Sequence, residues 1–323
     1  MKQPSTAWRE RIAPDEAALL ERVAEVMGGL QRARSATFGP GRALHRKQLL
    51  AATATLDVLP GLPEHARHGL FAVPGSHRAL VRLSNGGPDI QANRTPDIRG
   101  FALKVLDVSG AAALGGTADH QDFLMINQDR FPTPDIREFI GLMEAATAGQ
   151  LQGLLHVFKA HGLAGGLGRL GALFATLSKR FAGFAAERFN TVAPVCCGPY
   201  AVRVRLTPAG NPPSIARSKD IAADMRERLA SGPLIWTLEL QFFVDEAITP
   251  IEDVSKAWPD AETPIVAVAR LTLPRQGVDA VAAEAEAARF DPWGGLLAHR
   301  PLGEVMRARK VAYHASQTGR GAA

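Results

Sequence analysis

The stretch "TPDIRGFALKVLD", residues 95–107, decides the fold class. Its centre, "RGFALKVLDV" (99–108), is a short apolar run that ends in the turn sequence "SGAAALGG". Apolar runs bounded by Gly, Pro and Ser predict β-strands. The same texture occurs in three further runs: "LLAATATLDV" (49–58), "HRALVRLS" (77–84) and "DFLMIN" (122–127). We therefore expect an antiparallel β core over about residues 42–130.

The rest of the chain adds more strands and several helices. Strand texture returns at "YAVRVRLTP", "LIWTLELQFFVD" and "TPIVAVARLTL", which extends the core over about 200–275. Apolar residues at helical spacing predict helices at 14–34, over an insert of about 135–190, at 278–290, and in a basic tail over about 301–320. Because neither a repeat nor a low-complexity linker occurs, we expect one α+β domain, residues 1–323: an antiparallel β core with helical additions.

The helical insert has an unusual charge pattern. No Asp or Glu occurs between Glu144 and Glu187, whereas four basic residues do: Lys159, Arg169, Lys179 and Arg180. Residues 145–186 therefore have two interpretations, a helical hairpin packed on the barrel or a basic amphipathic surface for peripheral membrane contact. We favour the packed form, because a large exposed apolar patch is a liability in a soluble chain.

Composition excludes several classes of protein. The formal net charge of +5 over 323 residues favours anionic ligands, but no Lys/Arg run is long enough for a nucleic-acid arm. The two cysteines, Cys196 and Cys197, are adjacent, which disfavours a disulfide framework and a structural zinc site. The N-terminus has no apolar signal-peptide core, and no uncharged stretch has the length of a spanning helix. We expect a cytoplasmic protein. The sequence leaves open whether the protein forms a homo-oligomer.

The C-terminal tail carries one of only two tyrosines in the chain. On a helix, Arg309 and Tyr313 are i,i+4 neighbours, and Arg320 lies two turns further along the same face. A guanidinium beside a phenol stabilises the phenolate, which can be an axial ligand of ferric haem. The alternative is a surface tyrosine on a basic helix. Of the nine histidines, His45 stands out because it opens the β region three residues after Arg42.

Seven segments in the same order together resemble the catalase superfamily. "TPDIRGFALKVLD" is the most specific and is similar to that family's D-x-R-G-F-A-x-K strand. The others are "RALHRKQ" (42–48), "ALVRLSNG" (79–86), "NQDRFPTPD" (127–135), "IEDVSKAWPDAETPIVAVARLTL" (251–273), "FDPWGG" (290–295) and "RARKVAYHASQTGR" (307–320). The resemblance covers roughly residues 42–140 and 236–320. It implies an antiparallel β-barrel of the catalase type that binds haem b.

The resemblance also implies a role for each matching residue. His45 is the distal acid–base, with Asn127 as its polar partner, and Tyr313 is the axial iron ligand, stabilised by Arg309. A slip in register would instead make His120 or Gln121 the distal polar group. The other implied haem contacts are the propionate-binding arginines Arg42, Arg82 and Arg320, the pocket residue Ser84, and the aromatic residues Phe139 and Phe290.

The implied activity is that of a haem peroxidase or catalase-like enzyme acting on hydrogen peroxide or organic hydroperoxides. Residues 140–200 depart from the family, and a shorter wall around the haem would admit organic hydroperoxides as well as hydrogen peroxide. Leu44 stands where allene oxide synthase relatives have a hydroxyl residue, which disfavours that activity. Two alternatives stay open: an enzyme that transforms lipid hydroperoxides at a membrane through residues 145–186, and a haem-binding protein with little turnover.

Overall fold

The computed structural model describes residues 2–148, 158–159, 162, 165–168, 171, 179–216, 219–277 and 280–322. Most of the acid-free insert, residues 145–186, lies outside the described residues, so its two interpretations both stay predictions. In the part of the chain that is described, no helix has the length and apolarity needed to cross a bilayer.

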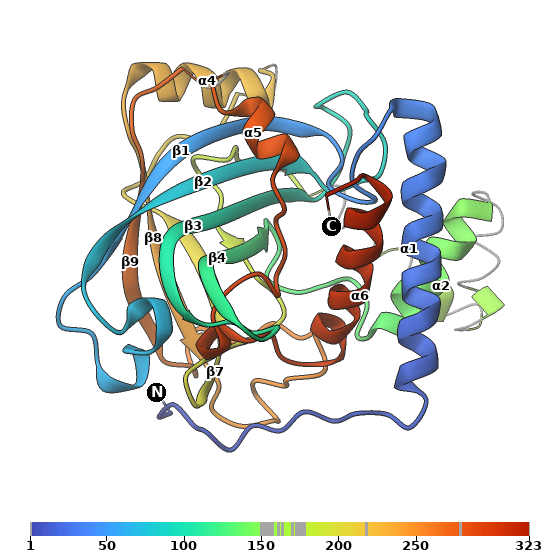
Figure 1. Cartoon of the computed structure of the whole chain (residues 1–323), viewed down its shortest axis with the longest axis horizontal. Coiled ribbons are helices and arrows are strands. Elements are labelled where there is room, and N and C mark those ends of the chain that lie inside the picture. The colour runs from blue at the N-terminus through green and yellow to red at the C-terminus, as the bar shows by residue number, and fades with distance from the viewer. Residues whose placement is uncertain are drawn as a thin grey trace.

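A closed antiparallel β-barrel forms the centre of the molecule (Figure 1). Its sheet runs in the order β5-β4-β3-β2-β1-β9-β8-β7-β6, and a further β5–β7 pairing closes it, which leaves β6 as an extension on β7. The strands are β1 (Gln48–Val58), β2 (Gly75–Asn85), β3 (Arg99–Ala111), β4 (Thr117–Ile126), β5 (Phe189–Asn190), β6 (Val195–Cys197), β7 (Tyr200–Pro208), β8 (Leu234–Phe242) and β9 (Ile265–Leu273). This confirms the predicted fold class.

Strand β3 shows why these sequences form a barrel. Its side chains alternate between two faces, as in any strand. Phe101, Leu103 and Val105 point inward and are fully buried. The interior is filled by large side chains that strands distant in sequence contribute; the Phe101 ring lies 5.3 Å from the Phe189 ring and 5.6 Å from the Trp236 ring. Closure therefore buries the inner face of every strand and leaves no long free edge.

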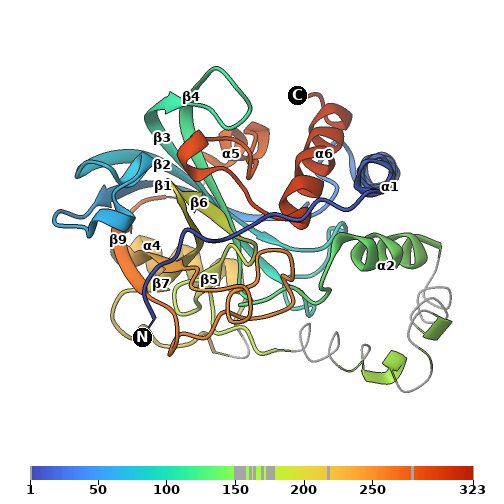
Figure 2. The ribbon, with the colours of Figure 1, turned by 90° about the horizontal axis from the view of Figure 1, so that it is seen from below.

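Helices lie against one side and over the top of the barrel (Figures 1 and 2). They are α1 (Glu16–Phe38), α2 (Ile136–Ala148), α4 (Ile221–Ser231), α5 (Ala282–Ala287) and α6 (Glu304–Gly319), with 3₁₀ turns at Glu64–Ala66, Gly69–Phe71 and Leu297–His299. The sequence analysis missed α4, although Asp220 caps its first turn by accepting from the N–H groups of Ala222 and Ala223.

Helix α6 lies between the barrel and α1 (Figure 2). The apolar side of α1 packs against Ala308 of α6 through Leu19, Val23 and Met27. Arg307 Nε, on α6, donates to Glu16 Oε1 of α1 at 2.6 Å. These contacts fix the angle at which α6 faces the barrel wall, so the helix that carries Tyr313 is held from behind.

A buried ion pair on the outer face of the barrel holds the turn that carries Phe290. Lys104 Nζ lies 2.7 and 2.8 Å from the two carboxylate oxygens of Asp122, its partner across the β3–β4 ladder. Asp122 Oδ2 also accepts from the backbone N–H of Asp291 at 2.9 Å. Burial raises the pKa of Asp122, and the Lys104 ammonium opposes that rise.

Asp122→Ala should destabilise the protein by about 3–5 kcal/mol, because it leaves the Lys104 ammonium buried without its counter-charge. Asp119→Ala is the matched control: that carboxylate is 94% exposed, so its removal should cost less than about 1 kcal/mol. Urea denaturation of both variants measures the difference. Equal midpoints for the two variants would show that the buried pair does not anchor the turn.

Candidate functional site

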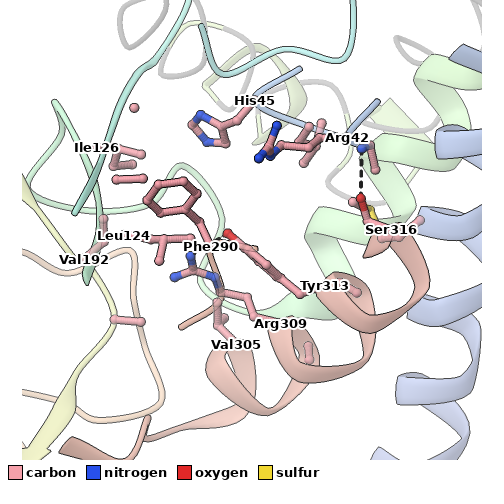
Figure 3. Close-up of a pocket in the computed structure, with 18 of the residues that line it drawn as sticks. Arg42, His45, Leu124, Ile126, Val192, Phe290, Val305, Arg309, Tyr313 and Ser316 are labelled. Atoms are coloured by element: carbon pink, nitrogen blue, oxygen red, sulfur yellow. Dashed lines mark hydrogen bonds between the residues drawn. The ribbon is translucent and has the colours of Figure 1, made fainter. Parts of the chain in front are cut away.

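A cavity of about 220 Å³ lies between the barrel wall and helices α1, α2 and α6 (Figure 3). The barrel contributes residues of β2, β3 and β4, and the segment before β1 and helix α6 contribute others. Most of its walls are apolar, with polar side chains gathered at a few places. Such a lining, with few polar groups that converge, is typical of a ligand site.

His45 points its ring into this cavity (Figure 3). Its backbone has a φ of 51°, held because its N–H donates to the Gly86 carbonyl at 2.9 Å and its carbonyl accepts from Arg82 Nη1 at 2.9 Å. Ring Nδ1 lies 3.0 Å from Ser84 Oγ. A Cβ atom at residue 100 would lie 2.5 Å from that same Nδ1, so only glycine fits at Gly100.

The imidazole of His45 is neutral at physiological pH. Burial lowers its pKa to about 3, and the guanidinium groups of Arg82, Arg309 and Arg42 lower it in the same direction. Among the described residues, no group hydrogen-bonds its other ring nitrogen, Nε2. When Nδ1 donates to Ser84, Nε2 therefore presents a free lone pair to the cavity.

Tyr313 enters the cavity from α6 with its hydroxyl directed inward (Figure 3). Arg309 Nη2, one turn earlier, donates to Tyr313 Oη at 2.8 Å. The helix is anchored on both sides of this pair. Trp293 Nε1 donates to the Met306 carbonyl at 2.7 Å, and Ser316 Oγ accepts from the backbone N–H of Ala43 at 3.1 Å. The second anchor ties α6 directly to the segment that carries His45.

Three arginines meet at one edge of the cavity. Arg42 Nη1 donates to Glu286 Oε1 at 2.6 Å, and Arg82 Nη2 donates to Glu286 Oε2 at 3.0 Å. Within the described part of the chain, Arg320 hydrogen-bonds to main-chain carbonyls alone, those of Glu286, Ala287 and Ala288. Burial lowers the pKa of Arg42 to about 9, and the neighbouring Arg82 adds to that effect. Arg42 and Arg82 therefore share one carboxylate. With Arg320 beside them, this edge has an excess of positive charge that suits an anion.

Most of the predicted site residues meet in this cavity. Its lining includes Arg42, His45, Arg82, Ser84, Phe139, Phe290, Arg309, Tyr313 and Arg320. These residues come from sequence positions almost 280 apart, and the barrel and α6 bring them to one place. Their chemical roles stay predictions.

Asn127 is not among the residues that line the cavity, and the expectation that it is the polar partner of His45 stays a prediction. Its carboxamide Oδ1 accepts from the backbone N–H of Arg99 at 2.8 Å. Ile126, the preceding residue, pairs with Gly100 and lines the cavity, whereas Asn127 follows the end of β4. The two alternatives, His120 and Gln121, do not line the cavity either.

Sequence reasoning did not find Glu286, which contacts two of the edge arginines, or many of the lining residues, Thr191 and Val192 among them. Glu286 contacts Arg42 across 244 positions, and no local pattern marks it apart from its place in the predicted helix 278–290. Thr191 and Val192 belong to a segment that departs from the catalase pattern. Val192 has a φ of 63°, which is rare for a β-branched residue and gives no sequence signal.

Comparison with known proteins supports the fold. No family model and no curated protein sequence matches the chain. Its structure is similar to catalase A from Saccharomyces cerevisiae (TM-score 0.69, 16% identity), a fungal catalase (0.67, 16%) and a bacterial catalase (0.60, 17%). Each match covers 99% of this chain but only 63–67% of the catalase. The chain therefore has a catalase-like fold over about two thirds of a catalase's length.

Glu286→Gln should lower the stability of the haem-free protein by about 1–2 kcal/mol. The change removes the carboxylate that both Arg42 and Arg82 contact, and charged hydrogen bonds are worth roughly 1.5–3 kcal/mol each before the partial exposure of Glu286 is considered. Glu284→Gln, an exposed position on the same helix, is the control and should change stability by less than about 0.5 kcal/mol. If both variants unfold at the same urea concentration, Glu286 does not hold the arginines together.

Proposed function

We propose that this protein is a haem-dependent peroxidase of the catalase type. One observation carries the proposal. The phenol of Tyr313, which is hydrogen-bonded to Arg309, and the neutral imidazole of His45 reach into the same cavity from different elements, beside an edge with excess positive charge. The similarity to solved catalases, at low sequence identity, supports only the fold. The proposal therefore rests on this set of side chains.

The residues present fit a haem. Tyr313 would supply the axial ligand, and its bond to Arg309 favours the phenolate form, because a hydrogen bond from a cation stabilises an anion. The three arginines at the cavity edge carry a charge of +3, and Glu286 offsets one of these charges. The remaining +2 equals the charge that two haem propionates would neutralise. Apolar side chains such as Phe290 and Val305 would contact the ring.

Bound ferric haem would supply the metal centre and the redox chemistry for cleaving a peroxide O–O bond. The protein's part in that reaction is proton transfer. His45 Nε2, neutral and without a partner among the described residues, can take a proton from one peroxide oxygen and return it to the other. Ser84 fixes the ring through Nδ1, so the same nitrogen faces the substrate in both steps.

Tyr313→Phe should abolish the ferric tyrosinate absorption spectrum that the haem-loaded wild type is expected to show. The phenyl ring keeps the shape of the side chain but has no oxygen to bind the metal. Tyr200→Phe, which changes the only other tyrosine, lies outside the cavity and should leave the spectrum unchanged. Haem titration followed by absorbance measures both variants, and an unaltered spectrum for Tyr313→Phe would refute the assignment.

His45→Ala should keep haem bound but lower the rate of peroxide turnover by about 10²–10⁴-fold, the usual effect of removing a positioned acid–base group. The exposed His314, next to Tyr313 on α6, gives the control variant His314→Ala, which should retain full activity. Stopped-flow mixing with peroxide measures both rates.

The pH profile gives an independent test of the same residue. Because the pKa of His45 is lowered to about 3, its base form persists as the pH falls through 7, 6 and 5. Wild-type turnover should therefore not decline through the range in which an ordinary histidine, with a pKa of about 6.5, becomes protonated. A loss of activity centred near pH 6.5 would contradict a neutral, buried base.

A further inference from the structure

Asp135 is the one carboxylate among the described residues that line the cavity. It precedes α2 and caps the first turn of that helix, since its Oδ1 accepts from the Glu138 N–H at 2.9 Å. In the part of the chain that the structure describes, no group hydrogen-bonds its other oxygen, Oδ2. One oxygen of this carboxylate therefore holds the helix, and the second is available to a ligand in the cavity.

Two aromatic side chains lie beside this carboxylate. Phe139 follows one helical turn later, and its N–H donates to the Asp135 carbonyl at 3.4 Å. Phe131 comes four residues before Asp135, and its N–H donates to the Val254 carbonyl at 2.9 Å. The two rings line the cavity with their centroids 5.3 Å apart and their planes at 57°. Tilted rings next to an acceptor suit a ligand that is itself an aromatic ring with a hydroxyl group.

This group of side chains lies far from the arginine edge. Glu304 Oε2, in the first turn of α6, accepts from the Ile136 N–H at 3.2 Å, so the start of α2 lies against the start of α6. Arg320 caps the opposite end of α6. Because α6 has 16 residues, its two ends are about 24 Å apart. The cavity thus has a basic end at Arg320 and an acidic, aromatic end at Asp135.

The acidic end keeps its negative charge. Burial raises the pKa of Glu304, and the charge of Asp135 adds to that rise, so the two carboxyl groups act on each other. The arginines in the first turns of α2 and α6, Arg137 and Arg307, are each bound to carboxylates of the N-terminal part of the chain. A second anion is therefore disfavoured at this end, and a neutral hydrogen-bond donor is favoured.

We propose that the acidic end binds the reducing substrate of the protein, and that this substrate is a small neutral phenol. Its ring would lie against Phe131 and Phe139, and its hydroxyl would donate to Asp135 Oδ2. This inference rests on the proposed peroxidase function and names the class of its electron donor.

The reaction balances when two phenols are oxidised for each peroxide. Each phenol gives one electron to the peroxide-oxidised haem and its O–H proton to Asp135, and leaves as a neutral phenoxyl radical. Asp135 then passes the proton to water and is ready for the second phenol. A base beside the hydroxyl assists the step, because a phenol that kept its proton would have to leave as a radical cation. The sum is H₂O₂ + 2 ArOH → 2 H₂O + 2 ArO•.

Asp135→Asn tests the carboxylate, because asparagine also caps a helix but provides neither the charge nor the base. With haem-loaded protein and guaiacol as the phenol, kcat/KM for guaiacol should fall by about 10²-fold or more. ABTS, a disulfonated donor that gives up an electron without a proton, should be oxidised no more slowly than by the wild type. Asp129→Asn is the matched control, since that side chain is 68% exposed and lies outside the cavity. An unchanged kcat/KM for guaiacol in Asp135→Asn overturns the inference.

Binding without turnover gives a second test. Guaiacol titrated into resting haem-loaded protein, with no peroxide present, should change the absorption spectrum and yield a Kd. Phe131→Leu should raise that Kd by about two- to tenfold, because it removes one ring of the aromatic pair. Equal guaiacol affinity in this variant and the wild type also overturns the inference.

The wild type separates the two proposals. If it binds haem and reacts with peroxide in stopped-flow mixing but oxidises no phenol, the donor site is refuted and the peroxide chemistry stands. Absence of haem binding, or of any reaction with peroxide, refutes the proposed function together with this inference.

Discussion

Strand β3 contributes side chains both to the barrel core and to the outer face that borders the cavity. The rest of the structure depends on this constraint. Its inward side chains, Phe101 among them, fill the barrel core. Its other face supplies Gly100 to the His45 ring and Lys104 to the buried pair with Asp122. Because the side-chain period of a strand is two, a shift of one residue would exchange these faces and lose the core and the cavity wall together.

Helix α6 and the three arginines at the cavity edge, Arg42, Arg82 and Arg320, provide the charged groups of the site. α6 is held to the turn after α5 through Trp293 and to the His45 segment through Ser316, so the phenol of Tyr313 has a fixed direction. Three arginines at the edge would repel one another if Glu286 did not stand between two of them. The protein thus maintains an excess of positive charge beside an otherwise apolar cavity, an arrangement that favours an apolar ligand with anionic groups at one end.

The sequence was informative where function depends on local spacing. The i,i+4 pair of Arg309 and Tyr313 could be read directly from the tail. The strand runs predicted an antiparallel β core, and the resemblance to catalases implied that this core forms a barrel. The hydrogen bond that Asn127 accepts from the Arg99 backbone could not be predicted, because it joins residues that meet only when β3 and β4 pair. Glu286 was missed because its partners are brought to it only when the barrel closes, and the left-handed backbone of Val192 contradicts the preference of its residue type.

The central claim is that Tyr313 and His45 belong to one haem site. The most direct measurement is a crystal structure of the purified protein after loading with haem. We predict one haem in the cavity, with Tyr313 Oη bound to the iron, the His45 ring on the opposite face, and the propionates beside Arg42, Arg82 and Arg320. A haem bound elsewhere, or bound in this cavity through a ligand other than Tyr313, would contradict the account.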